Sequence, residues 1–556
     1  MEKLLVFVAF LIYVIVVRAQ APRLRGRGAS MTRPLRPARR SNGVSGECRS
    51  LRTRSITGRC TSVSDPILGE ARRPQFSYLD VDTAEFNDMG LPSPRFISNT
   101  VSEQEGRTIN AQGLNDMFTF MGQFIDHDFA LSPFSDPREQ QNIEVPENDP
   151  ELDVDELEFV RSQRATLTSS SNLRPITVLT SALDLSNVYG SDEERNIGLR
   201  VPDSCRLKTS PGNLLPLNEE NFINSPSTSN EFFFAGDTRS NETPMLTAMH
   251  TIWVREHNRI CEEVEQLFSN RSPRNQYEIA RAITIAEYQK VIYEEWLPAI
   301  LGSRRLSNYN GHDRNVDPTI SLEFTTAGFR LGHTMVGTDV ARVDNNGNSL
   351  PSRPSEDQFF VRASEITNDE IENFLRGASK NVAEEFDERA VDVLRNFLFE
   401  NVEEEEGFDL IALNLQRSRD HNVPKFNELR EFFLGSRVSS FDEISSNPTT
   451  SANLEVAYGD VDNVEAWIGL MAEDKNNGIG VGRTLEALLV TEFERLRDGD
   501  QFFYKERNQI PRRALNRIDG IENEIFSDDP LFNRILLRNT DINPELLDVD
   551  SNAFII

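Results

Sequence analysis

The 556-residue sequence is poor in cysteine, histidine and basic residues. Four cysteines are few for a chain of this size, so its core does not depend on disulfides. Basic residues number 59 against 89 acidic ones, and the net charge of −30 argues against a general nucleic-acid binder. Apolar residues at 38% and charged residues at 27% are typical of a soluble globular protein, which excludes collagen and wholesale disorder.

Long apolar runs are also scarce, which excludes a protein that spans a membrane several times. The clear run covers residues 4–17, which is short for a bilayer span and typical of the apolar part of a signal peptide. Val17 and Ala19 favour cleavage near residue 19. We therefore expect residues 1–19 to be a signal peptide and the protein to be secreted, either extracellular or held in a secretory granule. A retained signal anchor is the alternative.

Residues 20–40 form a basic, arginine-rich segment. Seven arginines and no acid lie between residues 22 and 40, a composition that cannot bury a core and predicts disorder. The segment is either a pro-segment removed by proteolysis or a basic tail. The remainder, residues 41–556, is strongly acidic and is expected to be the folded domain.

The cysteines fall into two local groups. Cys48 and Cys60 lie close in sequence and predict a disulfide in an oxidising compartment. Cys205 and Cys261 either pair with each other or stay buried as free thiols. Four cysteines allow three pairings, and the sequence does not choose among them.

Wherever the apolar periodicity is clear, it is helical. Apolar residues that recur every three or four positions predict helices within residues 246–267, 279–297, 390–398 and 485–496. Period-two runs are rare, and no repeat of 20–50 residues is present. The expected fold is therefore mainly α, a single large domain with long loops and few short strands.

The densest polar motif surrounds His127. If residues 121–129 are helical, Gln123 and His127 are four positions apart and share one face. Asp126 and Asp128 flank the histidine within an apolar run, where unpaired charges are costly to bury. We therefore expect this helix to contact a cofactor or a metal on more than one side.

Four further segments concentrate polar groups between apolar flanks. The segment at residues 328–334 places a lone histidine, His333, after glycines; taken alone, a structural histidine is the simpler interpretation. Residues 234–244 and 413–421 could each be a buried ion-pair network. Residues 180–186 alternate oxygen-bearing side chains, a pattern suited to a hard cation such as Ca²⁺.

These five segments, in this order, resemble the animal haem peroxidases, the group of myeloperoxidase, lactoperoxidase and peroxidasin. The resemblance runs from about residue 48 to about residue 540. It implies haem b as cofactor, with His127 above the iron and His333 as the iron ligand. Asn414 matches the asparagine that hydrogen-bonds the proximal ring. The remaining matches are the distal pair Gln123 and Arg239, and Arg417 near a haem propionate.

The resemblance also implies covalent and metal chemistry. Asp126 and Glu242 match the carboxylates that form ester bonds to haem methyl groups in mammalian members. The calcium ligands of the family match Asp128, Thr180, Asp184 and Ser186, together with the carbonyl of Ala182. Calcium would then lie next to the helix that carries His127.

The function implied is that of a secreted haem peroxidase. It would reduce hydrogen peroxide and oxidise small anions (bromide, iodide, thiocyanate) or phenols and tyrosines, including those of matrix proteins. Oxidative defence or cross-linking of the extracellular matrix are the implied roles. Thr243 stands where myeloperoxidase has a methionine bonded to a haem vinyl group, so we expect little chloride turnover.

Two other functions are weaker. Cyclooxygenases resemble the family distantly but place a tyrosine three residues before the proximal histidine, and that position is Arg330 here. An adhesion protein that keeps the fold is the other alternative, but the sequence has no Arg-Gly-Asp tripeptide. Of the other histidines, we expect His250 and His257 to be structural and His421 to join an ion-pair network with Arg419 and Asp420.

Overall fold

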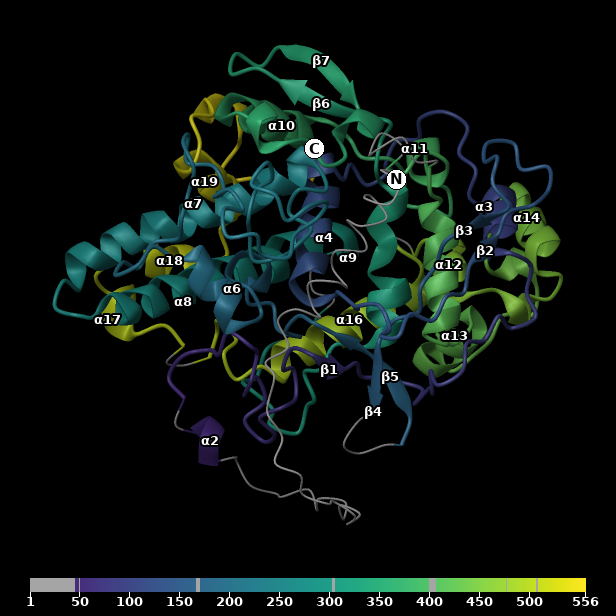
Figure 1. Ribbon diagram of the computed structural model, residues 1–556, viewed down its shortest axis with the longest axis horizontal. Helices are drawn as coiled ribbons and strands as arrows, with labels where there is room; N and C mark the ends of the chain where they lie inside the picture. The colour runs from purple at the N-terminus through teal and green to yellow at the C-terminus, as the bar shows by residue number, and fades with distance from the viewer. Residues whose placement is uncertain are drawn as a thin grey trace.

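The structure is a computed structural model that describes residues 46–49, 51–166, 171–302, 306–399, 407–476, 478–506 and 509–556. The expected signal peptide (1–19) and the arginine-rich segment (20–40) lie outside the described residues. Within the described ranges the chain is mainly helical with a few short strands, which confirms the predicted fold class (Figure 1). No helix in these ranges is both long and apolar enough to cross a membrane.

The longest described helices have eleven residues or more. They are α4 (Asp116–Phe129), α7 (Pro244–Leu267), α8 (Pro273–Val291), α10 (Asn368–Lys380), α12 (Leu410–Asp420), α14 (Pro448–Tyr458) and α16 (Arg483–Asp498). The shorter α-helices are α2 (Gly46–Arg49), α3 (Pro94–Val101), α5 (Ser186–Tyr189), α6 (Glu193–Leu199), α9 (Leu297–Leu301), α11 (Asp392–Arg395), α13 (Phe426–Leu434), α15 (Ala466–Ala472), α17 (Arg512–Leu515), α18 (Ile521–Phe526) and α19 (Phe532–Arg538).

Tighter and wider helical turns join these helices. Two are π-helical, η1 (Ile292–Trp296) and η2 (Phe324–Gly328). The 3₁₀ turns are η3 (Arg330–Thr334), η4 (Ser355–Gln358), η5 (Ala363–Glu365), η6 (Phe441–Glu443), η7 (Val461–Asn463) and η8 (Pro544–Leu546). π turns are frequent at functional sites, and η2 leads directly into η3, the turn that carries His333.

The described strands form small antiparallel sheets. One has the order β1 (Arg73–Pro74), β5 (Leu173–Thr177) and β4 (Arg164–Thr166). The others are the pairs β2 (Ile143–Glu144) with β3 (Glu156–Leu157) and β6 (Asp339–Val343) with β7 (Ser349–Pro354). The β6–β7 hairpin lies over α10 at the edge of the molecule (Figure 1).

Most of the helix predictions are confirmed. The stripes at 246–267 and 485–496 are α7 and α16, and the stripe at 279–297 runs through α8, η1 and α9. The helix predicted at 390–398 is wrong, because only α11 forms there. Ala390 and Leu398 instead pair through their backbones with residues 103 and 408, and the apolar side chains form a small separate cluster. Tertiary pairing overrides the helical pattern at this place.

Helix α4 runs through the middle of the fold (Figure 1). The side chain of Asn115 accepts a hydrogen bond from the Phe118 N–H and so caps the start of the helix. Its apolar residues, including Phe124, are buried against α7, α10 and α5. His127 therefore projects from a helix that the core holds on several sides.

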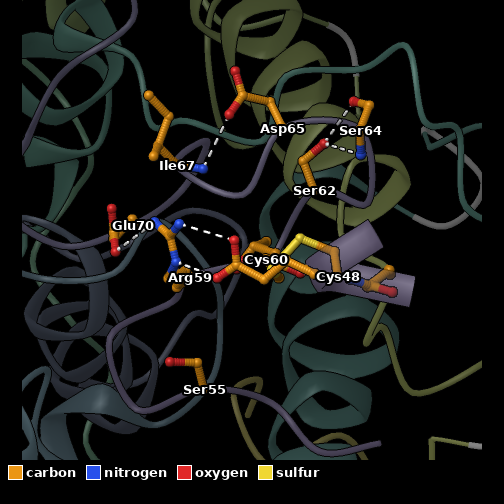
Figure 2. The surroundings of a disulfide bond; sticks show 12 residues. Cys48, Ser55, Arg59, Cys60, Ser62, Ser64, Asp65, Ile67 and Glu70 are labelled. Carbon is orange, nitrogen blue, oxygen red and sulfur yellow. Dashed lines mark hydrogen bonds and ion pairs between the residues drawn. A yellow bond between two sulfur atoms is a disulfide. The ribbon is translucent and has the colours of Figure 1, made fainter. Parts of the chain in front are cut away.

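Two disulfides are present. Cys48 pairs with Cys60, as predicted, and Arg59 beside them forms an ion pair with Glu70 (Figure 2). Arg59 also forms an ion pair with Glu47. Cys205 pairs with Cys261 on α7, which resolves the alternative that the sequence left open. No free cysteine remains among the described residues.

Candidate active site

His127 on α4 and His333 on η3 line one internal cavity of about 460 Å³. Glycine permits the close approach of the surrounding elements. A side chain at position 328 would lie 2.5 Å from Leu488, and one at position 236 would lie 2.5 Å from the carbonyl of Ser186. Gly328 therefore lets η2 pack closely against α16 just before His333. Gly236 lets the loop that carries Arg239 pack closely against the backbone of Ser186.

On the side of His127, carboxylates face both ring nitrogens. Nδ1 lies 3.6 Å from Asp237 Oδ1, and Nε2 lies 3.7 Å from Glu242 Oε2. Neither distance is a hydrogen bond, and Nδ1 has no hydrogen-bond partner among the described residues. Burial, with the nearby charge of Arg239, lowers the pKa of His127 well below its ordinary value of 6.5. The ring is therefore neutral and able to accept a proton.

Arg239 is held in place by Asp237. Its Nε and Nη2 donate to the two carboxylate oxygens of Asp237 at 2.9 and 3.0 Å, a bidentate pair. Burial alone would raise the pKa of Asp237, but Arg239 holds it well below the usual range. The same carboxylate thus orients Arg239 and faces His127. Asp237 was not predicted as a site residue, although it lies only two positions before Arg239.

Gln123, Asp126 and Glu242 also line the cavity. Gln123 Nε2 donates to Glu242 Oε2 at 3.0 Å, and Arg239 Nη1 lies 3.8 Å from Asp126 Oδ2. Burial raises the pKa of Asp126 to about 6 and that of Glu242 to about 7. Thr243 caps α7 by accepting the Leu246 N–H, so it has a structural role of its own.

On the side of His333, the partners are an amide and a cation instead of carboxylates. Asn414 on α12 places Nδ2 2.8 Å from His333 Nδ1, and Arg330 Nη1 donates to Asn414 Oδ1 at 2.6 Å. Burial, then Arg330, lowers the pKa of His333 to about 3. The ring is neutral, and the Asn414 amide N–H donates to Nδ1, so Nε2 carries the ring proton; a metal bound at Nε2 would take the place of that proton. Arg330 was identified from the sequence only as a departure from cyclooxygenases, and its contact with Asn414 was not predicted.

Arg417 and His421 complete the cavity wall near α12. Arg417 forms an ion pair with Asp420 at 2.8 Å. His421 lies between Thr326 Oγ1 at 2.7 Å and Ser162 Oγ at 2.8 Å. The prediction of a network with Arg419 is wrong, because that arginine pairs with Glu465 at 2.9 Å. The Asp420 part of the prediction is confirmed, because His421 Nε2 lies 3.8 Å from Asp420 Oδ2, and the two hydroxyls are its hydrogen-bond partners.

The two histidines of α7 differ. His257 is hydrogen-bonded to the Tyr189 hydroxyl at 2.9 Å and the Cys205 carbonyl at 2.8 Å, which supports the predicted structural role. His250 is buried against the ring of Phe124. Neither residue lines the cavity.

The expected calcium ligands also come together. Asp128 accepts the backbone N–H groups of Leu185 and Ser186 at 3.1 and 2.5 Å, and Thr180 Oγ1 donates to Asp184 Oδ1 at 2.9 Å. Both aspartates are fully buried, and Asp184 Oδ2 has no hydrogen-bond partner among the described residues. Burial and the neighbouring Asp184 raise the pKa of Asp128 to about 8. Two buried carboxylates with an unpartnered oxygen suit a hard cation.

The cavity fits a haem on the properties of its own residues. Two neutral histidines line it, and its wall is largely apolar, with Phe329 and Leu331 among the lining residues. Arg330 and Arg417 supply positive charge for carboxylates such as haem propionates. Within this cavity, Nδ1 of His127 has no hydrogen-bond partner among the described residues, and Asn414 orients the ring of His333, which suits two rings that act on a bound group.

Comparisons with known proteins agree with this geometry. A model of the family "animal haem peroxidase" matches residues 53–554. Eosinophil peroxidase of Homo sapiens is 33% identical over 526 residues, which cover 84% of this chain and 73% of that protein. Peroxinectin A of Dictyostelium discoideum is 32% identical over 484 residues, covering 81% of this chain and 88% of that protein.

Solved structures give the same result. Peroxidase A from Dictyostelium discoideum superposes with a TM-score of 0.80 at 28% identity, covering 91% of this chain and all of that one. A fatty acid alpha-dioxygenase of Oryza sativa, 17% identical with a TM-score of 0.76, shares the fold alone. This chain belongs to the animal haem peroxidase family and is an oxidoreductase that acts on hydrogen peroxide.

Proposed function

We propose that the protein reduces hydrogen peroxide with His127 as acid–base group, Arg239 as electrostatic donor and His333 as ligand of the haem iron. The observation that carries this proposal is the pairing of two neutral histidines across one cavity, with Arg239 clamped by Asp237 beside the first. Bound haem would supply the two electrons that cleave the O–O bond.

The proton chemistry follows from the groups around His127. The ionised Asp237 near Nδ1 favours the tautomer with its proton there, so Nε2 is the base. Nε2 takes the proton from one peroxide oxygen and returns it to the other as that oxygen leaves. Arg239 stays charged and stabilises negative charge on the departing oxygen, and Gln123 adds a donor to the same wall.

The haem esters are proposed for two carboxylates of the cavity. Asp126 and Glu242 line the cavity, and their raised pKa values keep a fraction of each carboxyl neutral near physiological pH. We propose that both bond to haem methyl groups. Acid-acetone extraction tests this, because colour retained in the protein pellet supports the esters. Loss of that colour from the pellet of the double variant Asp126→Ala, Glu242→Ala would assign the esters to these residues.

We propose that Ca²⁺ binds Asp128, Thr180, Asp184, Ser186 and the carbonyl of Ala182. The support is the buried pair of carboxylates, Asp128 and Asp184. Asp128 directly follows His127 in the sequence, so the ion would lie next to the site. Removal of the ion should leave the two buried carboxylates without a cation, so that Asp128 takes up a proton, and should lower the melting temperature. Chelation followed by addition of Ca²⁺ measures this, and Glu151, an exposed acid outside the site, offers a control substitution.

The reductants we propose are bromide, iodide, thiocyanate and phenols, including tyrosines of matrix proteins. Thr243 cannot form a sulfonium bond to haem, so chloride should be a poor substrate. The acidic surface should not repel these anions, because at about 0.1 M salt charges beyond roughly 10 Å are largely screened. Halide-dependent turnover at matched pH tests the order, and equal rates with chloride and bromide would overturn it.

We propose that the protein is secreted. Two disulfides support an oxidising compartment, where such bonds persist. Oxidative defence and matrix cross-linking are the roles that fit this location. Expression in an animal cell line, with assay of the medium and the cell lysate, tests the proposal: peroxidase confined to the lysate would contradict it.

A further inference from the structure

A continuous chain of aromatic rings leads away from the haem cavity. Trp296 and Phe329 both line that cavity, and their ring centroids are 5.6 Å apart. Phe493 on α16 lies 6.5 Å from Trp296 and 5.7 Å from Phe329. Tyr293 follows at 6.0 Å from Phe493, one turn before Trp296 on η1. All four rings are buried.

The chain of rings ends at a second, smaller cavity. Phe503 lies 5.2 Å from Tyr293, and Tyr309 lies 4.8 Å from Phe503. Tyr293, Tyr309 and Tyr504 line this cavity of about 220 Å³, which is separate from the haem cavity. Tyr309 is only half-buried, so the series connects the interior to the surface.

Tyr309 has the proton acceptor that a redox-active tyrosine needs. Its hydroxyl donates to Glu506 Oε1 at 2.6 Å, and the His312 N–H donates to the same oxygen at 2.7 Å. Burial and Glu506 raise the pKa of Tyr309 above its ordinary value, so the phenol keeps its proton until it is oxidised. Loss of an electron would then send that proton to Glu506.

We infer that Tyr309 is a second oxidation site, which accepts tyrosyl substrates too large for the haem cavity. Trp296, Tyr293 and Tyr309 serve as the oxidisable stations, and Phe493 and Phe503 bridge them. The inference rests on the proposed function, because hydrogen peroxide reduced at the haem is the oxidant.

The electron balance is complete. Tyr309 gives one electron to the oxidised centre and its proton to Glu506, leaving a neutral tyrosyl radical. A substrate phenol in the small cavity returns an electron to Tyr309, Glu506 returns the proton, and the substrate's proton goes to solvent. Two such cycles, with two protons taken up at the haem, reduce one peroxide to two waters. The two substrate phenoxyl radicals couple through a new carbon–carbon bond.

The chain contains a matched control for Tyr309. Tyr78 is also half-buried, donates to a carboxylate oxygen of Glu492 at 2.5 Å and packs against other rings. Within the described ranges, no ring pair joins its cluster to Trp296 or Phe329. Tyr78→Phe and Tyr309→Phe therefore remove similar hydroxyls, of which only one lies on the series of rings.

The test traps radicals in the purified holoenzyme. Peroxide is added without reductant in the presence of a nitroso spin trap, and the adducts are located by peptide mass spectrometry. We expect an adduct at Tyr309 in the wild type and in Tyr78→Phe, and none at this position in Tyr309→Phe. In Tyr293→Phe, which interrupts the series of rings, labelling of Tyr309 should fall to the background seen in Tyr309→Phe. Equal labelling at Tyr309 in wild type and Tyr293→Phe would overturn the relay.

A second readout separates this inference from the proposed function. Iodide oxidation should be unchanged in Tyr309→Phe, whereas dityrosine formation in a lysine–tyrosine copolymer should be lost in that variant and kept in Tyr78→Phe. Copolymer cross-linking at the wild-type rate by Tyr309→Phe would overturn the inference and leave the peroxidase intact. Absence of iodide oxidation from the wild type would instead contradict the proposed function.

Discussion

The two histidines of the haem cavity have opposite electrostatic surroundings. His127 faces the carboxylates of Asp237 and Glu242, whereas His333 faces the amide of Asn414 and, behind it, the cation of Arg330. Burial keeps both rings neutral, but only His127 has an anion nearby that could stabilise a transferred proton.

This difference explains how one residue type can serve two tasks. A histidine that shuttles a proton must accept it briefly, and nearby carboxylates lower the cost of that charge. A histidine that binds a metal must stay unprotonated, and a neighbouring cation makes protonation costly. Under the proposed function, the surroundings, and not the imidazole itself, would therefore distinguish the acid–base histidine from the ligand histidine.

The largest effect is expected for His127→Ala, which removes the proposed acid–base group. We expect the second-order rate constant for peroxide to fall by roughly 10²–10⁴, because the proton must then move without a positioned base. The haem absorption band should be retained, since the ligand lies on the other side. Stopped-flow absorbance measures both, and a rate within a few-fold of wild type would refute the role of His127.

The next largest effect is expected for Arg239→Ala. Loss of one preorganised donor should lower the same rate constant by roughly 10²–10³. Arg362, an exposed arginine paired with Glu231, provides the control, because Arg362→Ala removes the same charge from the surface. If both variants lost activity equally, the effect would reflect net charge and not the position of Arg239.

Smaller effects are expected for two substitutions, one beside each histidine, that should change different measurements. Asn414→Ala should weaken haem retention by roughly 10–100-fold, because His333 loses the group that orients its ring, with little effect on the peroxide step per bound haem. Asp237→Asn should do the reverse, slowing the peroxide step while haem stays bound. Haem titration and stopped-flow kinetics separate the two, and parallel effects in both assays would show that the sides are not independent.

The smallest effect concerns pH. Burial and Arg239 lower the pKa of His127, so its base form should persist below the ordinary histidine value of 6.5. The peroxide rate constant should therefore show no loss at 6.5 and fall only at more acidic pH. Asp237→Asn removes the anion that favours protonated His127, so the acidic fall should move to still lower pH. A midpoint at 6.5 in a profile from about pH 8 to about pH 4 would contradict this.

The helices of the fold were predictable wherever apolar periodicity is long. α7 and α16 show this, since nothing in their sequences competes with the helical pattern. Residues 390–398 have the same pattern, but their ends pair with the backbone of residues 103 and 408. Apolar periodicity carries no information about such non-local pairing. Periodicity alone also could not show that residues 292–296 widen into a π turn.

The grouping of the predicted site residues was predictable from motif order, whereas their roles stay a prediction and their supporting contacts were not predictable. Gln123, His127, Arg239, His333 and Asn414 could be assigned by resemblance, and the structure brings them to one cavity or, for Asn414, into contact with it. Asp237 and Arg330 act through side-chain geometry that folding alone reveals. The aromatic series to Tyr309 draws on five separate segments, so no local pattern could indicate it.

The central claim is that haem is bound through His333, and the absorption spectrum of purified, hemin-supplied protein tests it most directly. The account predicts a Soret band in the wild type that is retained in His127→Ala and lost in His333→Ala. A Soret band of wild-type intensity and peroxidase turnover in His333→Ala would contradict it.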